Sequence, residues 1–166
     1  MKSINSESSG QAAVEYLLIF SAVLAVFTAV TITQIINPAS DAARDSLYLS
    51  QARTAVDAIA GAINTVYSNG QGAVKSISLQ MDRTWTLQLD NIRNKLRIMV
   101  EISAGVENVE DNLQYKIENY HSISNIADGA YTVIVEWPEN ENVHEDLYGG
   151  ALADKKIYIY IGRGGG

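Results

Sequence analysis

The feature that most constrains this chain is an uninterrupted apolar segment near its N-terminus. Residues 16–36 contain no charged side chain, and twelve of these 21 residues are Leu, Ile, Val or Phe. As an α-helix the segment would be roughly 31 Å long, which matches the hydrocarbon core of a bilayer. The apolar region of a cleaved secretory signal peptide is shorter, about 7–15 residues, and a buried helix of a soluble protein rarely stays uncharged over such a length. The segment therefore predicts a helix that enters a membrane at some stage.

Composition limits what the remaining chain can be. The 166 residues fit one domain of ordinary size, and 47% apolar against 19% charged residues excludes a disordered chain. The absence of Cys excludes disulfides, thiolate metal sites and a Cys nucleophile, and two His residues are too few for a multi-His metal site. Because the net charge is −7 and no basic cluster interrupts it, we expect no nucleic-acid partner.

A single carboxylate, Glu15, directly precedes the apolar segment. A charge beside an apolar helix is costly unless it lies at the membrane interface or has a cationic partner. The apolar segment offers no cation, but a cut after Gly10 would create one, the α-amino group of Gln11. Glu15 would then lie about one helical turn from the new N-terminus. Both explanations, an interface marker and a partner of the amine, are consistent with the residues alone.

The run Gly10–Leu18, GQAAVEYLL, resembles the leader junction of archaeal type IV pilins with a class III signal peptide. Members of that family show a Gly–Gln cut site, small residues, a Glu fifth from the cut and often a Tyr, followed by an apolar helix. This sequence matches them at Gly10, Gln11, Glu15 and Tyr16. It departs from them just before the cut, where family leaders are usually more basic.

The resemblance implies how such a chain would be processed and assembled. A membrane prepilin peptidase would remove residues 1–10 as a leader and leave the helix attached. Gln11, Glu15 and Tyr16 would then be the residues of assembly into a helical filament of identical subunits. A cytoplasmic ATPase and a membrane platform protein would drive extrusion, so the chain itself would be cargo that needs no cofactor.

A second helical segment follows, at residues 37–69. Pro38 removes a backbone donor and disfavours a helical conformation at Asn37, which predicts either a kink at Pro38 or a restart with Asn37 as the N-cap. A C-cap signal at Ser68–Gly70 ends the segment. Residues 11–68 would then form one long helix. Apolar residues at spacings of three or four predict one buried face, made of Leu49, Ala52, Val56, Ile59, Ile63 and Val66.

The C-terminal region, 70–166, reads as strands. Apolar and polar residues alternate over 77–81, 85–89 and 96–102, with turns at 82–83 and 90–94, which predicts an antiparallel meander with one buried face. We also expect a weaker strand at 113–117 and stronger ones at 131–137 and 157–161. The predicted fold class is α+β, with a long N-terminal helix that packs by its C-terminal half on an antiparallel β-sheet domain. The predicted segments are 1–10, 11–36, 37–69 and 70–166.

No catalytic or metal-binding motif occurs in the sequence. His121 is expected to be a surface or packing residue. His144 lies in the acidic stretch 139–150, whose oxygen-rich composition suits Ca²⁺, but the spacing fits no EF-hand and a solvated loop is expected instead. We therefore predict no enzymatic activity, no metal and no cofactor.

Two classes of function remain open. The first is a structural subunit of an archaeal type IV pilus, which polymerises through its apolar helix into a surface filament for adhesion or cell contact. The alternative is a membrane-anchored monomeric surface protein whose β-domain binds a ligand or partner. The Gly10–Gln11 junction with Glu15 favours the first, because an ordinary anchor needs no carboxylate there. The expected location is the membrane for the precursor and the cell surface for the mature filament.

Overall fold

The structure is a computed structural model that describes residues 5–118, 120–139, 152–154 and 156–163. The chain divides into two compact units, Met1–Arg44 and Asp45–Gly166. The first is helical throughout its described residues, and the second combines most of a helix with two antiparallel sheets. This confirms the predicted α+β class and the long apolar N-terminal helix.

The first unit contains helix α1 (Asn5–Thr31), the π-helical turn η1 (Ile32–Ile36) and the beginning of α2 (Asn37–Asn69). Helix α1 begins at Asn5, upstream of the expected start at Gln11, so the Gly10–Gln11 bond lies inside a helix. No residue between 5 and 11 lacks a backbone donor. Adding residues to an existing helix costs little once it is nucleated, so the helix extends from the apolar segment into the polar residues before it.

The chain remains helical through Pro38. The expected restart is wrong, because Asn37 has φ −61° and ψ −52°, which are helical angles and not those of an N-cap. The irregularity lies one step earlier, in η1, where the Asn37 N–H donates to the Ile32 carbonyl five residues back. Pro38 lacks an N–H, and its ring crowds the carbonyl four residues before it, so a widened turn is the local accommodation. The expected kink stays a prediction.

Helix α2 supplies the centre of the second unit. The predicted apolar face is confirmed: Leu49 is half-buried and the other five residues are fully buried, from Ala52 to Val66. Three alanines widen this face on its flanks, namely Ala55, Ala60 and Ala62. Their small side chains let strands approach the helix from both sides. The helix ends as predicted at Asn69, where Gly70 adopts φ +82° and donates its N–H to the Val66 carbonyl at 3.0 Å.

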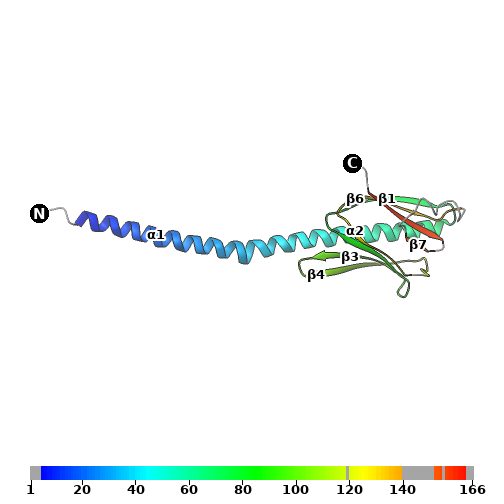
Figure 1. Ribbon diagram of the computed structural model, residues 1–166, viewed down its shortest axis with the longest axis horizontal. Coiled ribbons are helices and arrows are strands. Elements are labelled where there is room, and N and C mark those ends of the chain that lie inside the picture. Colours follow the sequence, from blue (N-terminus) through cyan, green and yellow to red (C-terminus); the bar gives the residue numbers. More distant parts are fainter. Residues whose placement is uncertain (1–4, 119, 140–151, 155, 164–166) are drawn as a thin grey trace. The chain divides into compact units, whose positions relative to one another are not determined.

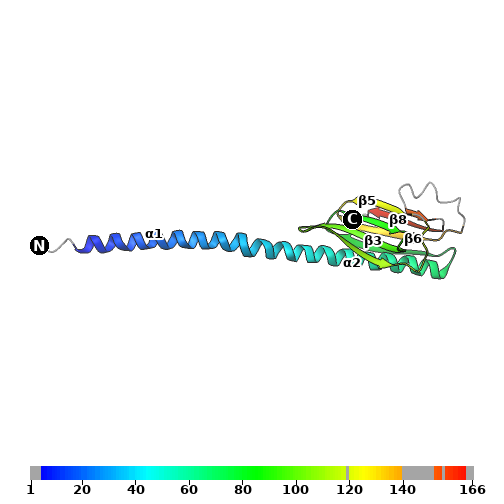
Figure 2. The same ribbon diagram turned by 90° about the horizontal axis from the view of Figure 1, so that it is seen from below.

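Two four-stranded antiparallel sheets pack against the buried face of α2. The first has the order β1-β6-β8-β7, with β1 (Val74–Met81), β6 (Gly129–Glu136), β8 (Ile157–Arg163) and β7 (Leu152–Asp154). The second has the order β4-β3-β2-β5, with β4 (Gly105–Asn112), β3 (Lys95–Ile102), β2 (Trp85–Asp90) and β5 (His121–Ile126). Strands β5 and β7 contact each other, so β1 and β4 are the outer edges. In the view of Figure 1, β1 and β6 lie on one side of α2 and β3 and β4 on the other, whereas in the view of Figure 2 both sheets lie along the same side of the helix.

The predicted meander is wrong at its first connection. Strands β2 and β3 pair as expected, but β1 pairs with β6, with Val74 opposite Glu136 and Met81 opposite Gly129. The chain passes from one sheet to the other at Asp82. The Asp82 N–H donates to Gln51 Oε1 of α2 at 3.0 Å, and this fixes the crossing against the helix.

The expected strand at 113–117 is an irregular segment. Leu113, Tyr115 and Ile117 are buried as their alternation suggests. Their backbone, however, bonds to side-chain amides and to a turn: Ile117 N–H donates to Asn94 Oδ1 at 2.9 Å, and Asn94 Nδ2 donates to the Leu113 carbonyl at 2.6 Å. An alternating pattern indicates which side chains are buried. It does not show whether the backbone bonds to a neighbouring strand, and at 113–117 the backbone bonds to Asn94 instead.

Three strands were not predicted. Strands β4 and β5 end the second sheet, and their sequences, GVENVEDN and HSISNI, are mostly polar. Strand β7 has only three residues. Strand β4 is an outer edge, and the charged residues that are common along exposed edges replace the apolar alternation there.

Candidate functional site

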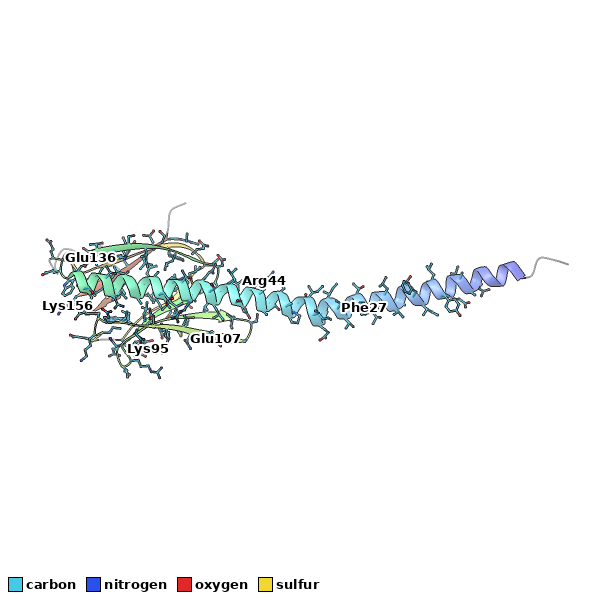
Figure 3. All side chains as sticks on the ribbon, turned by 180° about the vertical axis from the view of Figure 1, so that it is seen from behind. Phe27, Arg44, Lys95, Glu107, Glu136 and Lys156 are labelled. Carbon is cyan, nitrogen blue, oxygen red and sulfur yellow. The ribbon has the colours of Figure 1, made fainter. Side chains whose placement is uncertain are left out.

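The apolar segment of α1 and η1 exposes its side chains in all directions. All twelve Leu, Ile, Val and Phe side chains between residues 16 and 36 are exposed, and those around Phe27 point outward around the helix (Figure 3). Within the described chain, α1, η1 and α2 form one continuous helical run, and over Gly10–Asn69 this run contains a stretch long and apolar enough to cross a membrane. Such a surface requires lipid or other apolar protein around it.

The hydroxyl groups of this segment are already bonded within the helix. Ser21 donates to the Leu17 carbonyl at 2.7 Å, and Thr28 donates to the Leu24 carbonyl at 2.8 Å. Thr31 and Thr33 donate in the same way to carbonyls four residues earlier. In an apolar medium an unbonded donor costs several kcal/mol. The four Ser and Thr hydroxyls of the segment are therefore compatible with an apolar medium.

One side of the segment carries a shallow apolar groove. It has a volume of about 480 Å³ and is lined by Ala22, Val23, Val26, Phe27 and Val30. These positions recur at the helical spacing, so the groove runs along one face. The small side chain of Ala22 beside the larger Val and Phe residues offers room for side chains of a neighbouring helix or for lipid.

The predicted junction residues come together on the surface of α1. Gln11 Nε2 lies 3.4 Å from Glu15 Oε1, one turn along the helix, and Tyr16 beside them is 74% exposed. The ion pairs found among the described residues do not include Glu15. A Cβ added to Gly10 would meet nothing within 4 Å. Because Gly costs about 1 kcal/mol relative to Ala inside a helix, the fold gives no reason for glycine at this position.

The β-domain contains a charge cluster that the sequence did not reveal. Glu110 of β4 receives Lys95 Nζ on one carboxylate oxygen at 3.0 Å and Arg97 Nε on the other at 2.7 Å. These two hydrogen bonds hold the pKa of Glu110 below its ordinary value, against the opposing effect of burial. The sequence hints at this cluster only through the charged residues of KLR (95–97) and ENVED (107–111). Which of these charges meet depends on the β3–β4 register. The cluster joins the two strands and leaves no group open for chemistry.

Of the two histidines, the structure describes His121. His121 is the first residue of β5, half-buried and opposite Leu89 of β2. His144 and nearly all of the acidic stretch 139–150 lie outside the described residues. Among the residues that the structure does describe, no group of three or more His, Asp or Glu is placed to hold a metal ion.

Comparison with known proteins identifies no relative: no family model, no curated protein and no solved structure matches the chain.

Proposed function

We propose that this chain is a structural subunit of an archaeal type IV pilus, without catalytic activity of its own. One observation carries the proposal: the junction GQAAVEY lies in the same helix as an apolar segment whose side chains are exposed on every side. A helix that only anchors a protein also needs apolar side chains. It has no need of glycine at the cut position or of a carboxylate at Glu15, and the fold of this chain explains neither residue.

The physical chemistry of the helix suits a subunit that moves from lipid into a fibre. Before assembly the apolar segment is dissolved in the membrane. When neighbouring helices replace the lipid, little hydrophobic free energy is gained, and close packing in grooves such as the one beside Phe27 stabilises the contact. Once the fibre leaves the membrane, the same side chains are kept from water, worth roughly 25 cal/mol per Å² of apolar surface. The filament is thus stable outside the cell.

Removal of residues 1–10 supplies the missing partner of Glu15. The new amine of Gln11 lies four residues before Glu15, or about 6 Å along the helix axis. A carboxylate buried in a helical core is costly, and the amine of an adjacent subunit shifted by about that distance offsets the cost. The proposed contact between subunits is therefore Glu15 of one helix with the amine of Gln11 of the next.

Two measurements on the full chain test the proposal. The mass of the mature protein should equal that of residues 11–166, and surface material sheared from cells should sediment as filaments that contain it. Gly10→Val, which places a branched side chain at the cut, should leave the full-length mass and no filaments. An uncleaved wild-type chain that stays with the membrane after shearing would contradict the proposal and support the anchored monomer.

A further inference from the structure

Among the described residues, the most exposed large apolar side chain belongs to Ile92, which is 90% exposed. It lies in the turn between β2 and β3, at residues 91–94. Single apolar residues are common on protein surfaces. Ile92 differs from an ordinary surface residue in the rigidity of the turn that presents it.

Several side chains hold this turn in place. Asp90 Oδ1 accepts the N–H groups of Ile92 at 2.9 Å and Arg93 at 3.1 Å. Asn94, with φ +56°, is hydrogen-bonded to the 113–117 segment through both the nitrogen and the oxygen of its side-chain amide. Asn91 donates to the Glu118 carbonyl at 3.2 Å. A rigid turn loses little conformational entropy when its exposed side chain binds a partner.

A recess of suitable size lies between α2 and the edge strand β1. Its volume is about 240 Å³. The buried side chains of Ala55 and Leu79 form its apolar floor, and Ser50, Thr54 and Ser78 belong to its polar rim. An apolar cavity of about 150 Å³ can hold a benzene molecule, so this recess has room for the side chain of an isoleucine.

A basic side chain lies beside the turn and an acidic one beside the recess. Arg93 follows Ile92 and takes part in none of the ion pairs found among the described residues. Asp82 lies next to the recess, where it accepts hydrogen bonds from two of the lining side chains, Gln51 Nε2 at 2.7 Å and Gln80 Nε2 at 3.0 Å. An isoleucine that enters the recess would bring the neighbouring arginine close to this carboxylate.

The Ile92 turn cannot reach the recess of its own domain. The 113–117 segment that clasps the turn is bonded to α2 at Asn64, whose Oδ1 accepts the Gln114 N–H at 2.8 Å. The recess lies about 15 Å along α2 from Asn64, since Thr54 is ten residues earlier and the helix rises about 1.5 Å per residue. A projection and a matching recess at different places on one molecule give a head-to-tail contact that repeats without closing.

We propose that the Ile92 turn of one subunit docks into the recess between α2 and β1 of a neighbouring copy, with Arg93 beside Asp82. This inference rests on the proposed filament and adds a second contact, between β-domains, to the one between apolar helices. The contact buries Ile92 and covers part of the open edge of β1, two features that are otherwise exposed.

Cross-linking of assembled filaments tests this contact, because the chain has no cysteine of its own. Ile92→Cys combined with Ser78→Cys in one chain places a thiol on the turn and one on the rim. After mild oxidation with diamide, denaturing electrophoresis should show a ladder of dimers, trimers and larger species. The control combines Ser78→Cys with Val106→Cys, an exposed valine at the start of β4, and it should remain monomeric.

The outcomes separate this inference from the proposed function. Filaments whose subunits stay monomeric with the Ile92 pair would overturn the contact and leave the pilus subunit intact, whereas a wild-type chain that forms no filaments would overturn both. A second comparison applies if the cysteine pair impairs assembly. Ile92→Ser should lower the temperature at which filaments dissociate by several degrees, and Val106→Ser should not. Equal temperatures for the two variants would reject the contact.

Discussion

Two glutamates in this protein have different roles because their surroundings differ. Glu110 is paired on both oxygens by Lys95 and Arg97, and its side chain is only 23% exposed. Glu15 is exposed on α1 and bonded only weakly, to Gln11 at 3.4 Å. The first is satisfied within its own domain. The second becomes satisfied, in our proposal, only when the leader has been removed and another subunit is present.

Glu110→Gln should reduce the stability of the β-domain in a pH-dependent way. The pKa of Glu110 is lowered in the folded state, so its contribution is present above the ordinary carboxyl pKa and is lost as the pH falls through the lowered value. At pH 7 we expect the free energy of unfolding to fall by about 1 kcal/mol. In acid the difference from the wild type should disappear.

Chemical denaturation at several pH values measures this effect. Glu107→Gln is the matched control, because Glu107 lies on the same strand, is exposed and takes part in none of the ion pairs found among the described residues. Equal destabilisation by the two substitutions would show that strand charge, and not the paired carboxylate, is responsible.

Glu15→Gln keeps the shape of the side chain and removes its charge. Because the amine of Gln11 then lacks a counter-ion, we expect subunits that are cleaved and held in the membrane but that polymerise poorly. The mass of the protein and the yield of sheared filaments distinguish these two steps. Filament yield equal to that of the wild type would show that Glu15 only marks the membrane interface.

At the scale of elements, one proline and one glycine shape the helical part of the chain. Pro38 is preceded by the π-turn η1, which absorbs the missing hydrogen bond without ending the helix. Gly70, with φ +82°, ends α2 and lets the chain turn back into β1. The polar residues of α2 also act on the sheets, since Arg53 Nη1 donates to the Glu110 carbonyl of the edge strand β4 at 3.2 Å.

Pro38→Ala restores a backbone donor at the position that follows η1. We expect the widened turn to become ordinary α-helix, which changes the rotation of the N-terminal segment about the helix axis and thereby the packing of subunits. The thermal unfolding of the β-domain should not change, because its core begins at Ala52. Helical reconstruction of filaments by electron microscopy measures the first effect. Unchanged filament symmetry would show that η1 is set by other residues.

At the scale of the whole molecule, the two units place their apolar residues in opposite ways. The fully buried apolar residues of the described chain all lie in Asp45–Gly166, from Ala52 to Ile159. The apolar side chains that the structure describes in Met1–Arg44 are exposed. The second unit therefore contains its own core, and the apolar side chains of the first require lipid or other apolar protein around them.

A fragment of residues 45–166 should fold as a soluble monomer. All the buried positions of α2 are retained, so we expect one cooperative thermal transition and a single species in analytical ultracentrifugation. Ile59→Ala, which removes a fully buried side chain, should destabilise the fragment by about 2–5 kcal/mol. A fragment without cooperative unfolding would show that the first unit contributes to the fold of the second.

The sequence by itself determined the features that depend on neighbours along the chain. The apolar segment, the buried face of α2 and its end at Gly70 follow from helical spacing and from the angles that glycine tolerates. The strands β2, β3, β6 and β8 follow from a two-residue alternation, because their inner faces meet the core. The junction at Gly10–Gln11 and Glu15 was also visible in the sequence, and its role stays a prediction.

Tertiary structure alone decided which segments pair and which atoms meet. The alternation of β1 is satisfied equally by a β2 or a β6 partner, and the bond between Gln51 and Asp82 directs the chain to the second sheet. At 113–117 the same alternation belongs to a segment whose bonds go to Asn94 and Asn64. Whether a side chain is buried depends mainly on its own chemistry. Its hydrogen-bond partners can lie dozens of residues away, and only the folded chain brings them within reach.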